Sequence, residues 1–411
     1  MPSRLAVSRT TPRFRLYIAA AGALAAGLAL AVAAAGHRAP QAPPPLALTP
    51  CHLDGLAEPA RCGTLSVPED RGAPGGRRIG IQVAVLPALR GGRPADPVLF
   101  LAGGPGQAGR ELAGPAARFF RAVRRHRDLI FVDLRGTGGS NRLDCALHPD
   151  PLAGLASDSY FPVDVAACRD RLAQRADLRR YAESEAMADL DQVRSALGIE
   201  RWNLWGGSWG TRAALLYARA YSSRVRAAVL DGAASLDFRF PLTTPADAQA
   251  ALDRSLADCA AEPACRAAYP RLAEELAALF RSLERGPARA AIRDPVSGAR
   301  RSIPGGAPAR SGPPVRRSTR PLAIPALILS GALDPATPPR RGEAMRAAFP
   351  RSRHTVFPGA AHNASFSGCA PELIARFLDD PEPARLDDRC ARALRRAPFD
   401  APAVSAAEVA R

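Results

Sequence analysis

Short, uninterrupted apolar runs recur along this chain, and stretches with helical spacing of apolar residues lie between several of them. A strand buried on both faces produces such a run, whereas a half-buried helix repeats its apolar residues every three or four positions. Strands that alternate with helices indicate a parallel sheet with right-handed crossovers. We therefore predict an α/β fold with a mostly parallel, doubly wound sheet. Its strands are expected at 62–68, 78–87, 97–102, 128–133, 201–204, 226–231, 324–331 and 353–358, and helices at 186–197, 212–219 and 372–378.

The pattern changes after residue 234, where helical spacing is found without intervening strand runs. We interpret 236–320 as a helical cap inserted over the sheet edge. Its clearest apolar stripe consists of Leu272, Leu276, Leu279, Phe280 and Leu283. Within the cap, 297–321 is rich in arginine, proline and glycine, a low-complexity composition that predicts disorder.

The N-terminal 36 residues have the pattern of a targeting segment. Arginines precede an apolar run at 16–35, which is mostly alanine and ends in small residues suited to cleavage. The weak hydrophobicity of alanine favours a cleaved signal peptide, and an uncleaved inner-membrane anchor is the alternative. In both cases we expect the remainder to be exported, periplasmic or extracellular. The other divisions are a proline-rich linker at 37–50, expected to be extended and without a core, a core at 51–235 and 321–395, and a tail at 396–411.

The charge pattern does not favour nucleic-acid binding. The formal charge is +17, but all 56 basic residues are arginine and they are scattered through the chain. No long basic run is interleaved with aromatic residues, as a nucleic-acid groove would require. We therefore expect no nucleic-acid partner.

The chain has eight cysteines and no C-x-x-C spacing, which argues against a zinc or redox motif. An even number behind a targeting segment suggests disulfides, although unpaired buried thiols are the alternative. Eight cysteines allow 105 connectivities. The simplest joins sequence neighbours: Cys51–Cys62, Cys145–Cys168, Cys259–Cys265 and Cys369–Cys390.

A nucleophile-elbow spacing, Gly206-x-Ser208-x-Gly210, lies between an apolar run and a helical pattern. A serine at such a strand-to-helix turn has an exposed hydroxyl, and the glycines let strand and helix approach. A glycine-rich turn with an incidental serine has the same letters, but the strand–turn–helix context favours the nucleophile.

Two further loops follow strand runs and carry Asp334 and His362. Serine, acid, histidine is the chain order of an α/β-hydrolase triad, and loops at strand carboxyl ends share one rim of the sheet. We assign Ser208 as nucleophile, His362 as base and Asp334 as the acid that orients it. Asp231 also ends a strand run and is the alternative acid.

The oxyanion hole needs backbone N–H groups that point at the developing negative charge. We expect one from Trp209, the residue after the nucleophile, and one from the loop that contains Gly103 and Gly104. The alternative for that loop is a plain tight turn.

Together these motifs resemble the prolyl iminopeptidase family, and more closely its secreted tripeptidyl-aminopeptidase branch with a TAP-like C-terminal domain. The matching motifs are G-G-P-G-Q at 103–107, D-L-R-G-T-G at 133–138, G-G-S-W-G-T at 206–211, S-G-A-L-D-P-A-T-P-P at 330–339 and P-G-A-A-H-N at 358–363. The resemblance covers roughly 50–395. It implies a serine exopeptidase that acts from free N-termini through an acyl-enzyme, without metal or cofactor.

This chain departs from the family at two places. Ala102 stands where prolyl iminopeptidases usually carry histidine, as the TAP-like branch allows, and the cap is shorter than the family's. The family's acidic cap residues bind the substrate amine, and we assign none here. Because the cap is short, a broad esterase or amidase on the same triad is the alternative to an aminopeptidase. An inactive hydrolase-fold protein is the second alternative.

Overall fold

The computed structural model describes residues 45–90, 96–145, 165–238, 242–285, 289–293, 300–304 and 320–399. Within these ranges the chain builds one nine-stranded sheet in the order β1-β2-β3-β5-β4-β6-β7-β10-β11. The six strands from β5 to β11 are parallel, and β1, β2 and β3 pair antiparallel at one edge. The strands are β1 Thr49–Cys51, β2 Ala60–Pro68, β3 Arg78–Leu86, β4 Val98–Leu101, β5 Leu129–Val132, β6 Trp202–Gly207, β7 Val225–Asp231, β10 Ala326–Gly331 and β11 Ser352–Phe357.

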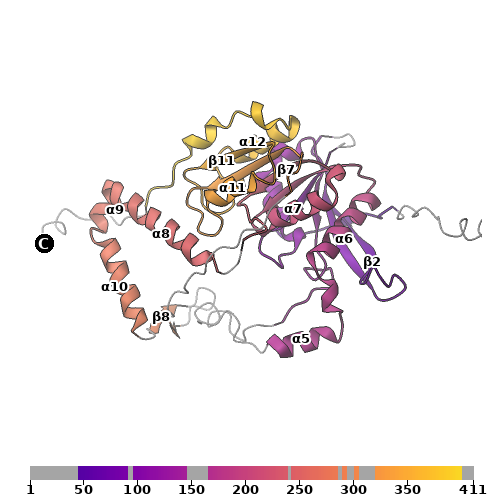
Figure 1. The fold of residues 1–411 in the computed structure, drawn as a ribbon, viewed down its shortest axis with the longest axis horizontal. Helices are drawn as coiled ribbons and strands as arrows, with labels where there is room; N and C mark the ends of the chain where they lie inside the picture. Colours follow the sequence, from indigo (N-terminus) through magenta and orange to yellow (C-terminus); the bar gives the residue numbers. More distant parts are fainter. Residues whose placement is uncertain are drawn as a thin grey trace, which may run out of the picture. The chain divides into compact units, whose positions relative to one another are not determined.

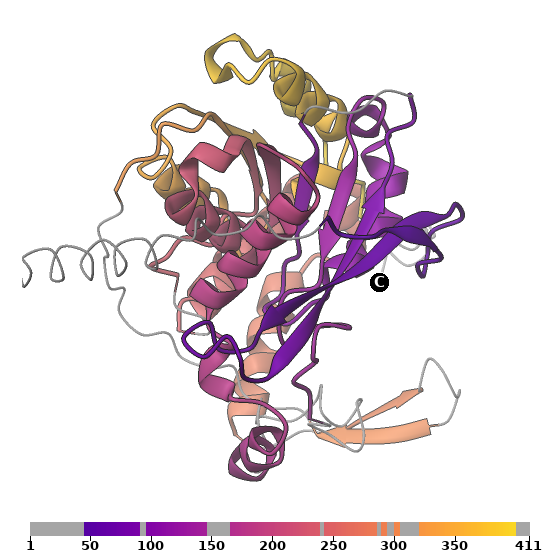
Figure 2. The ribbon, with the colours of Figure 1, turned by 90° about the vertical axis from the view of Figure 1, so that its right-hand side faces the viewer.

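Helices cover both faces of this sheet, as the alternating pattern predicts. Alternate residues of β4 show the two layers, because Leu99 packs into one buried cluster and Phe100 into the other. The first cluster also receives residues of α6 Glu183–Ala196, α7 Trp209–Ala220 and α11 Pro339–Met345, and the second receives residues of α2 Ala113–Phe119, α3 Arg121–Arg124 and α12 Ala370–Asp379. Figure 1 labels these elements, and Figure 2 shows the long β2–β3 pair in indigo to violet. The predicted doubly wound sheet is confirmed.

The segment expected to form a cap is helical, as predicted. It contains α8 Thr244–Ala261, α9 Pro263–Ala268 and α10 Leu272–Glu284. The predicted stripe of α10 is not buried: Leu279 is 52% exposed. Hydrogen bonds join this segment to the core and to the tail: Arg341 Nε donates to Asp247 Oδ2 at 3.0 Å, and Phe399 N donates to Glu262 Oε1 at 3.2 Å.

Two expectations are wrong for part of their range. The proline-rich linker was expected to lack a core, but Leu46 and Leu48 pack against the sheet and Thr49–Cys51 adds β1 to β2. Antiparallel pairing with β2 satisfies backbone groups that an isolated extended segment would leave to water. Similarly, Arg300–Pro304 forms strand β9, which pairs with β8 Arg289–Arg293 inside the region expected to be disordered. The rest of 297–321, apart from its last two residues, lies outside the described residues.

All four sequence-neighbour disulfides are confirmed: Cys51–Cys62, Cys145–Cys168, Cys259–Cys265 and Cys369–Cys390. The first joins β1 to β2 at the sheet edge, and the third joins α8 to α9. In the part of the chain covered by the structure, no helix is long and apolar enough to span a bilayer. The predicted targeting segment at 1–36 lies outside that part.

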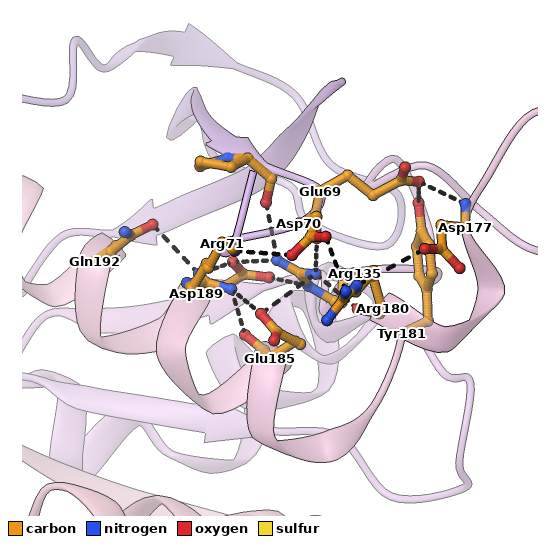
Figure 3. Close-up of polar contacts among 12 residues, drawn as sticks. Glu69, Asp70, Arg71, Arg135, Asp177, Arg180, Tyr181, Glu185, Asp189 and Gln192 are labelled. Atoms are coloured by element: carbon orange, nitrogen blue, oxygen red, sulfur yellow. Dashed lines mark hydrogen bonds and ion pairs between the residues drawn. The ribbon is translucent and has the colours of Figure 1, made fainter. Parts of the chain in front are cut away.

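A partly buried ion network, here called the Arg135 network, ties the β2–β3 turn to α6 (Figure 3). It consists of Glu69, Arg71, Arg135, Glu185 and Asp189. Arg135 donates to both carboxylate oxygens of Asp189, at 2.6 and 2.8 Å, and to the Glu69 and Arg180 carbonyl oxygens, at 2.9 and 2.7 Å. Bidentate guanidinium–carboxylate geometry satisfies both partners inside the protein.

Candidate active site

Ser208 occupies the sharp turn between β6 and α7, as the elbow spacing predicts. Its φ of 52° and ψ of −120° are strained for a residue with a side chain. The flanking glycines are required by close packing: a Cβ on Gly206 would lie 2.4 Å from the Gly210 carbonyl oxygen, and one on Gly210 would lie 2.1 Å from the Leu101 carbonyl oxygen. The surrounding backbone therefore holds the serine in this conformation.

The structure brings Asp334 and His362 together across 28 residues of sequence. His362 Nδ1 lies 2.8 Å from Asp334 Oδ2, and both residues are in loops that follow parallel strands. Asp334 is 1% exposed, and its other oxygen accepts the Ala336 and Thr337 N–H groups at 2.8 Å each. The buried Asp334 carboxylate therefore faces the partly exposed imidazole of His362.

Thr337 is a member of this group that the sequence analysis did not identify. Its hydroxyl donates to Asp334 Oδ2 at 2.6 Å and lies 3.1 Å from His362 Nδ1. The available signal was the D-x-x-T spacing, in which a hydroxyl residue three positions after an aspartate can close a local turn. Thr337 therefore limits the orientations of both triad partners.

The charges of this pair support each other. Burial opposes ionisation of Asp334, but the hydrogen bond and charge of His362, with the Thr337 bonds, hold its pKa below the usual range. Burial likewise opposes protonation of His362, yet the hydrogen bond and charge of Asp334, together with the charge of Asp231, raise its pKa above the usual value. The site is thus electrostatically arranged to hold an imidazolium.

Ser208 and His362 are held near each other through intervening residues. The Ser208 N–H donates to the Asp231 carbonyl oxygen at 2.8 Å, and a Cβ on the next residue, Gly232, would lie 3.2 Å from His362 Cε1. Among the described residues, Ser208 Oγ has no hydrogen bond to His362. Catalytic hydrogen bonds are often long without substrate and shorten in the complex.

The alternative acid, Asp231, makes no hydrogen bond to His362 within the described chain. Its Oδ2 instead accepts the Ser365 N–H at 2.9 Å. The geometry therefore favours Asp334 as the partner of His362. Another histidine, His354 within β11, lies 3.0 Å from Ser330 Oγ and 3.1 Å from Glu343 Oε2.

The three residues expected to form the oxyanion hole border the elbow. Trp209 begins α7, where the first N–H groups have no acceptor within the helix. A Cβ on Gly103 would lie 3.0 Å from Ser208 Cβ, and Gly104 has a φ of 57°. Beside them is a cavity of about 150 Å³ lined by Ala102, Gly106, Gln107, Tyr181, Glu183 and Trp209 among others.

A larger cavity, of about 880 Å³, is not part of this site. Its lining includes Val225 and Ile324, which stand at or before the amino ends of β7 and β10. The candidate site is at the carboxyl ends of these parallel strands, where ligands bind in open α/β sheets.

Strand order, elbow and loop placement define an α/β-hydrolase fold. The model of the alpha/beta hydrolase fold family matches residues 96–368, and the chain belongs to this family.

Curated relatives include peptidases and an esterase. Serine protease Hip1 of Mycobacterium tuberculosis is 29% identical over 296 residues, covering 64% of this chain and 55% of that protein. Carboxylesterase B of M. tuberculosis is 32% identical over 225 residues (50% and 43%), and tripeptidyl aminopeptidase of Streptomyces lividans is 28% identical over 203 residues (44% and 37%). The chain thus spans about half the length of Hip1 and less of the other two.

Proposed function

We propose that this protein is an exported serine hydrolase, and specifically an aminopeptidase of the prolyl or tripeptidyl type. The observation that carries the proposal is the strained Ser208 elbow beside the buried Asp334–His362 pair. The peptidase relatives support the reaction class, and the four disulfides support export.

In the proposed reaction, Ser208 Oγ attacks the carbonyl carbon of a peptide bond while His362 Nε2 takes its proton. Asp334 keeps the proton of the other ring nitrogen on Nδ1 and stabilises the imidazolium that forms. His362 then gives its proton to the leaving amine, which departs with the C–N bond broken and leaves an acyl-enzyme. Water, deprotonated by His362, hydrolyses this ester and restores Ser208.

The N–H groups of Trp209 and of the Gly103–Gly104 loop would bind the oxyanion. One such donor contributes about 10²- to 10³-fold in rate in a serine protease. The cavity beside these residues offers space for the substrate on the oxyanion side of Ser208.

The second candidate is a broad esterase or amidase on the same triad, favoured by the similarity to carboxylesterase B. The two candidates differ in whether a free substrate amine is needed. The test uses the purified protein, with Ser208→Ala as control. The substrates are aminoacyl and tripeptidyl chromogenic amides, with free or blocked N-termini, and a short-chain ester.

We expect turnover of the free-amine amides and its loss in the control. Ester turnover without preference for a free amine would instead establish the esterase. A folded protein with no Ser208-dependent turnover of any of these compounds would contradict both and leave the inactive alternative.

A further inference from the structure

Asp231 ends β7 between the nucleophile elbow and the histidine loop, and it bonds to both. Its carbonyl oxygen accepts the Ser208 N–H at 2.8 Å. Its side-chain Oδ2 accepts the Ser365 N–H at 2.9 Å, three residues after His362. One buried residue thus links the two loops that must face each other for proton transfer.

A second connection runs through the same place. Ser365 is fully buried, and its hydroxyl oxygen accepts a hydrogen bond from Trp205 Nε1 at 3.1 Å. Trp205 belongs to β6, three residues before Ser208. The histidine loop is therefore attached to the elbow strand through Ser365 and to the neighbouring strand through Asp231.

The carboxyl of Asp231 has no cationic partner of the kind that other buried carboxylates here have. It is fully buried, and its Oδ1 has no hydrogen-bond partner among the described residues. Burial raises the pKa of Asp231 to about 6, although the Ser365 N–H and hydroxyl, the charge of His362 and the Ala364 N–H counteract it.

The charged groups around Asp231 and His362 come from several elements. Asp334 in the loop after β10 bonds to His362, and Asp231 at the end of β7 acts on it through its charge. Arg341 of α11 interacts through its charge with Asp237 and with Asp334. Asp231 is thus the only carboxylate, besides Asp334, whose charge raises the proton affinity of His362 within the described chain.

We propose that Asp231 is a positioning residue of this site: it holds the Ser208 elbow and the His362 loop in register and places a buried carboxylate against the histidine loop. This inference rests on the proposed function. As Asp231 gains a proton on acidification, its support for imidazolium is lost. The acidic limb of the rate profile, which His362 sets, therefore also depends on the charge of Asp231.

A buried aspartate could also serve stability alone, and Asp133 provides the comparison. Asp133 is equally buried at the end of β5, but it accepts the Arg110 N–H and Nε–H at 3.0 and 2.9 Å and the Gly139 N–H at 3.0 Å. It has a guanidinium partner and no contact with His362. Asp133→Asn is therefore the matched control for Asp231→Asn.

The test measures how fast Ser208 reacts with a fluorophosphonate probe as a function of pH. In this reaction Ser208 Oγ bonds to phosphorus, fluoride leaves, and His362 takes the proton. Labelling of the wild type but not of Ser208→Ala, together with ester turnover per labelled site, gives the baseline. Because labelling counts only competent molecules, losses in folding are separated from losses in rate.

For Asp231→Asn, whose amide oxygen can still accept the Ser365 N–H, we expect the acidic limb to move to lower pH by about 1 pH unit, because a nearby negative charge is lost. For Asp231→Ala, which also loses the Ser365 bond, we expect the plateau kcat to fall at least about tenfold with little change in KM, since misplaced catalytic groups cost rate. For Asp133→Asn we expect no change in the acidic limb of the pH profile or in the plateau kcat per labelled site.

An Asp231→Asn limb that coincides with the wild type would overturn the charge role. An Asp231→Ala plateau equal to the wild type would overturn the positioning role; because the plateau is taken per labelled site, it is measured on the molecules of this variant that fold. A wild-type protein in which Ser208 is not labelled would contradict the proposed function itself, and the inference would fall with it.

Discussion

Two clusters of buried polar side chains stand at the same end of the sheet, and they are built differently. In the Arg135 network, the carboxylate of Asp189 is matched by the guanidinium groups of Arg135 and Arg71 (Figure 3). In the candidate site, Asp334 is matched by a titratable imidazole and a hydroxyl, and Asp231 has no arginine partner among the described residues. Arginine stays charged at any physiological pH, whereas histidine does not.

The difference separates a structural role from a chemical one. The Arg135 network fixes the β2–β3 turn on α6 through ion pairs and hydrogen bonds to backbone carbonyl oxygens, and in the described chain its members make no hydrogen bond to Ser208 or His362. In the candidate site the proton affinity of His362 depends on its neighbours, because burial lowers it and the carboxylates of Asp334 and Asp231 raise it. Perturbed groups of this kind concentrate at functional sites.

The largest expected effect is on the reacting residue. Ser208→Ala should reduce kcat by about 10⁶-fold, as loss of the nucleophile does in a serine protease, with the thermal midpoint unchanged. Turnover of the ester and probe labelling measure it. Residual Ser208-independent turnover close to the wild type would place the chemistry elsewhere and remove the basis of the comparison.

Asp334→Asn should lower kcat by about 10⁴-fold, because an amide stabilises the wrong imidazole tautomer. The same variant should leave the folded state intact, since its backbone N–H partners remain available to the amide oxygen. Steady-state kinetics and a denaturation curve test the two parts. A drop in stability without a drop in kcat would show that Asp334 has a structural role and not a chemical one.

Arg135→Met should show the opposite behaviour. This change leaves Asp189 with Arg71 alone and removes the donor to the Glu69 and Arg180 carbonyl oxygens, so the free energy of unfolding should fall by about 3–5 kcal/mol. Turnover per probe-labelled site should fall far less than in Asp334→Asn, although Arg135 also lines the cavity beside Trp209. Arg179→Met breaks an exposed pair with Asp177 and is the control, for which we expect no measurable change in the denaturant midpoint. Equal effects of the two variants would contradict the assignment.

The smallest expected effect is in the pH profile. His362 must be neutral to accept the serine proton, and its pKa is raised, so kcat/KM should decline on acidification with a midpoint above the usual histidine value of about 6.5. Arg135→Met should show the same midpoint, because Arg135 makes no hydrogen bond to His362 among the described residues. Activity of wild type and Arg135→Met from pH 5 to 9 provides the check, and a wild-type midpoint well below 6 would contradict it.

Much of the fold was predictable because its signals are local. Apolar runs predicted β4, β5, β7 and β10, helical spacing predicted α6, and the glycine–serine spacing predicted the Ser208 elbow. The four disulfides joined sequence neighbours, where a short intervening segment keeps the two thiols close. Asp334 and His362 were predicted because each follows a strand run, and parallel strands place such loops on one rim.

The remaining features depend on residues that are distant in sequence. The linker residues around Leu46 were expected to have no core because proline-rich composition does not reveal that a sheet edge will accept a strand. Asp231 joins Ser365 across 134 residues, and Arg135 joins Asp189 across 54. Periodicity specifies which face of an element is buried, but not which buried polar groups meet there. That choice is made by packing in the folded chain, because each buried donor or charge must find a partner when water is excluded.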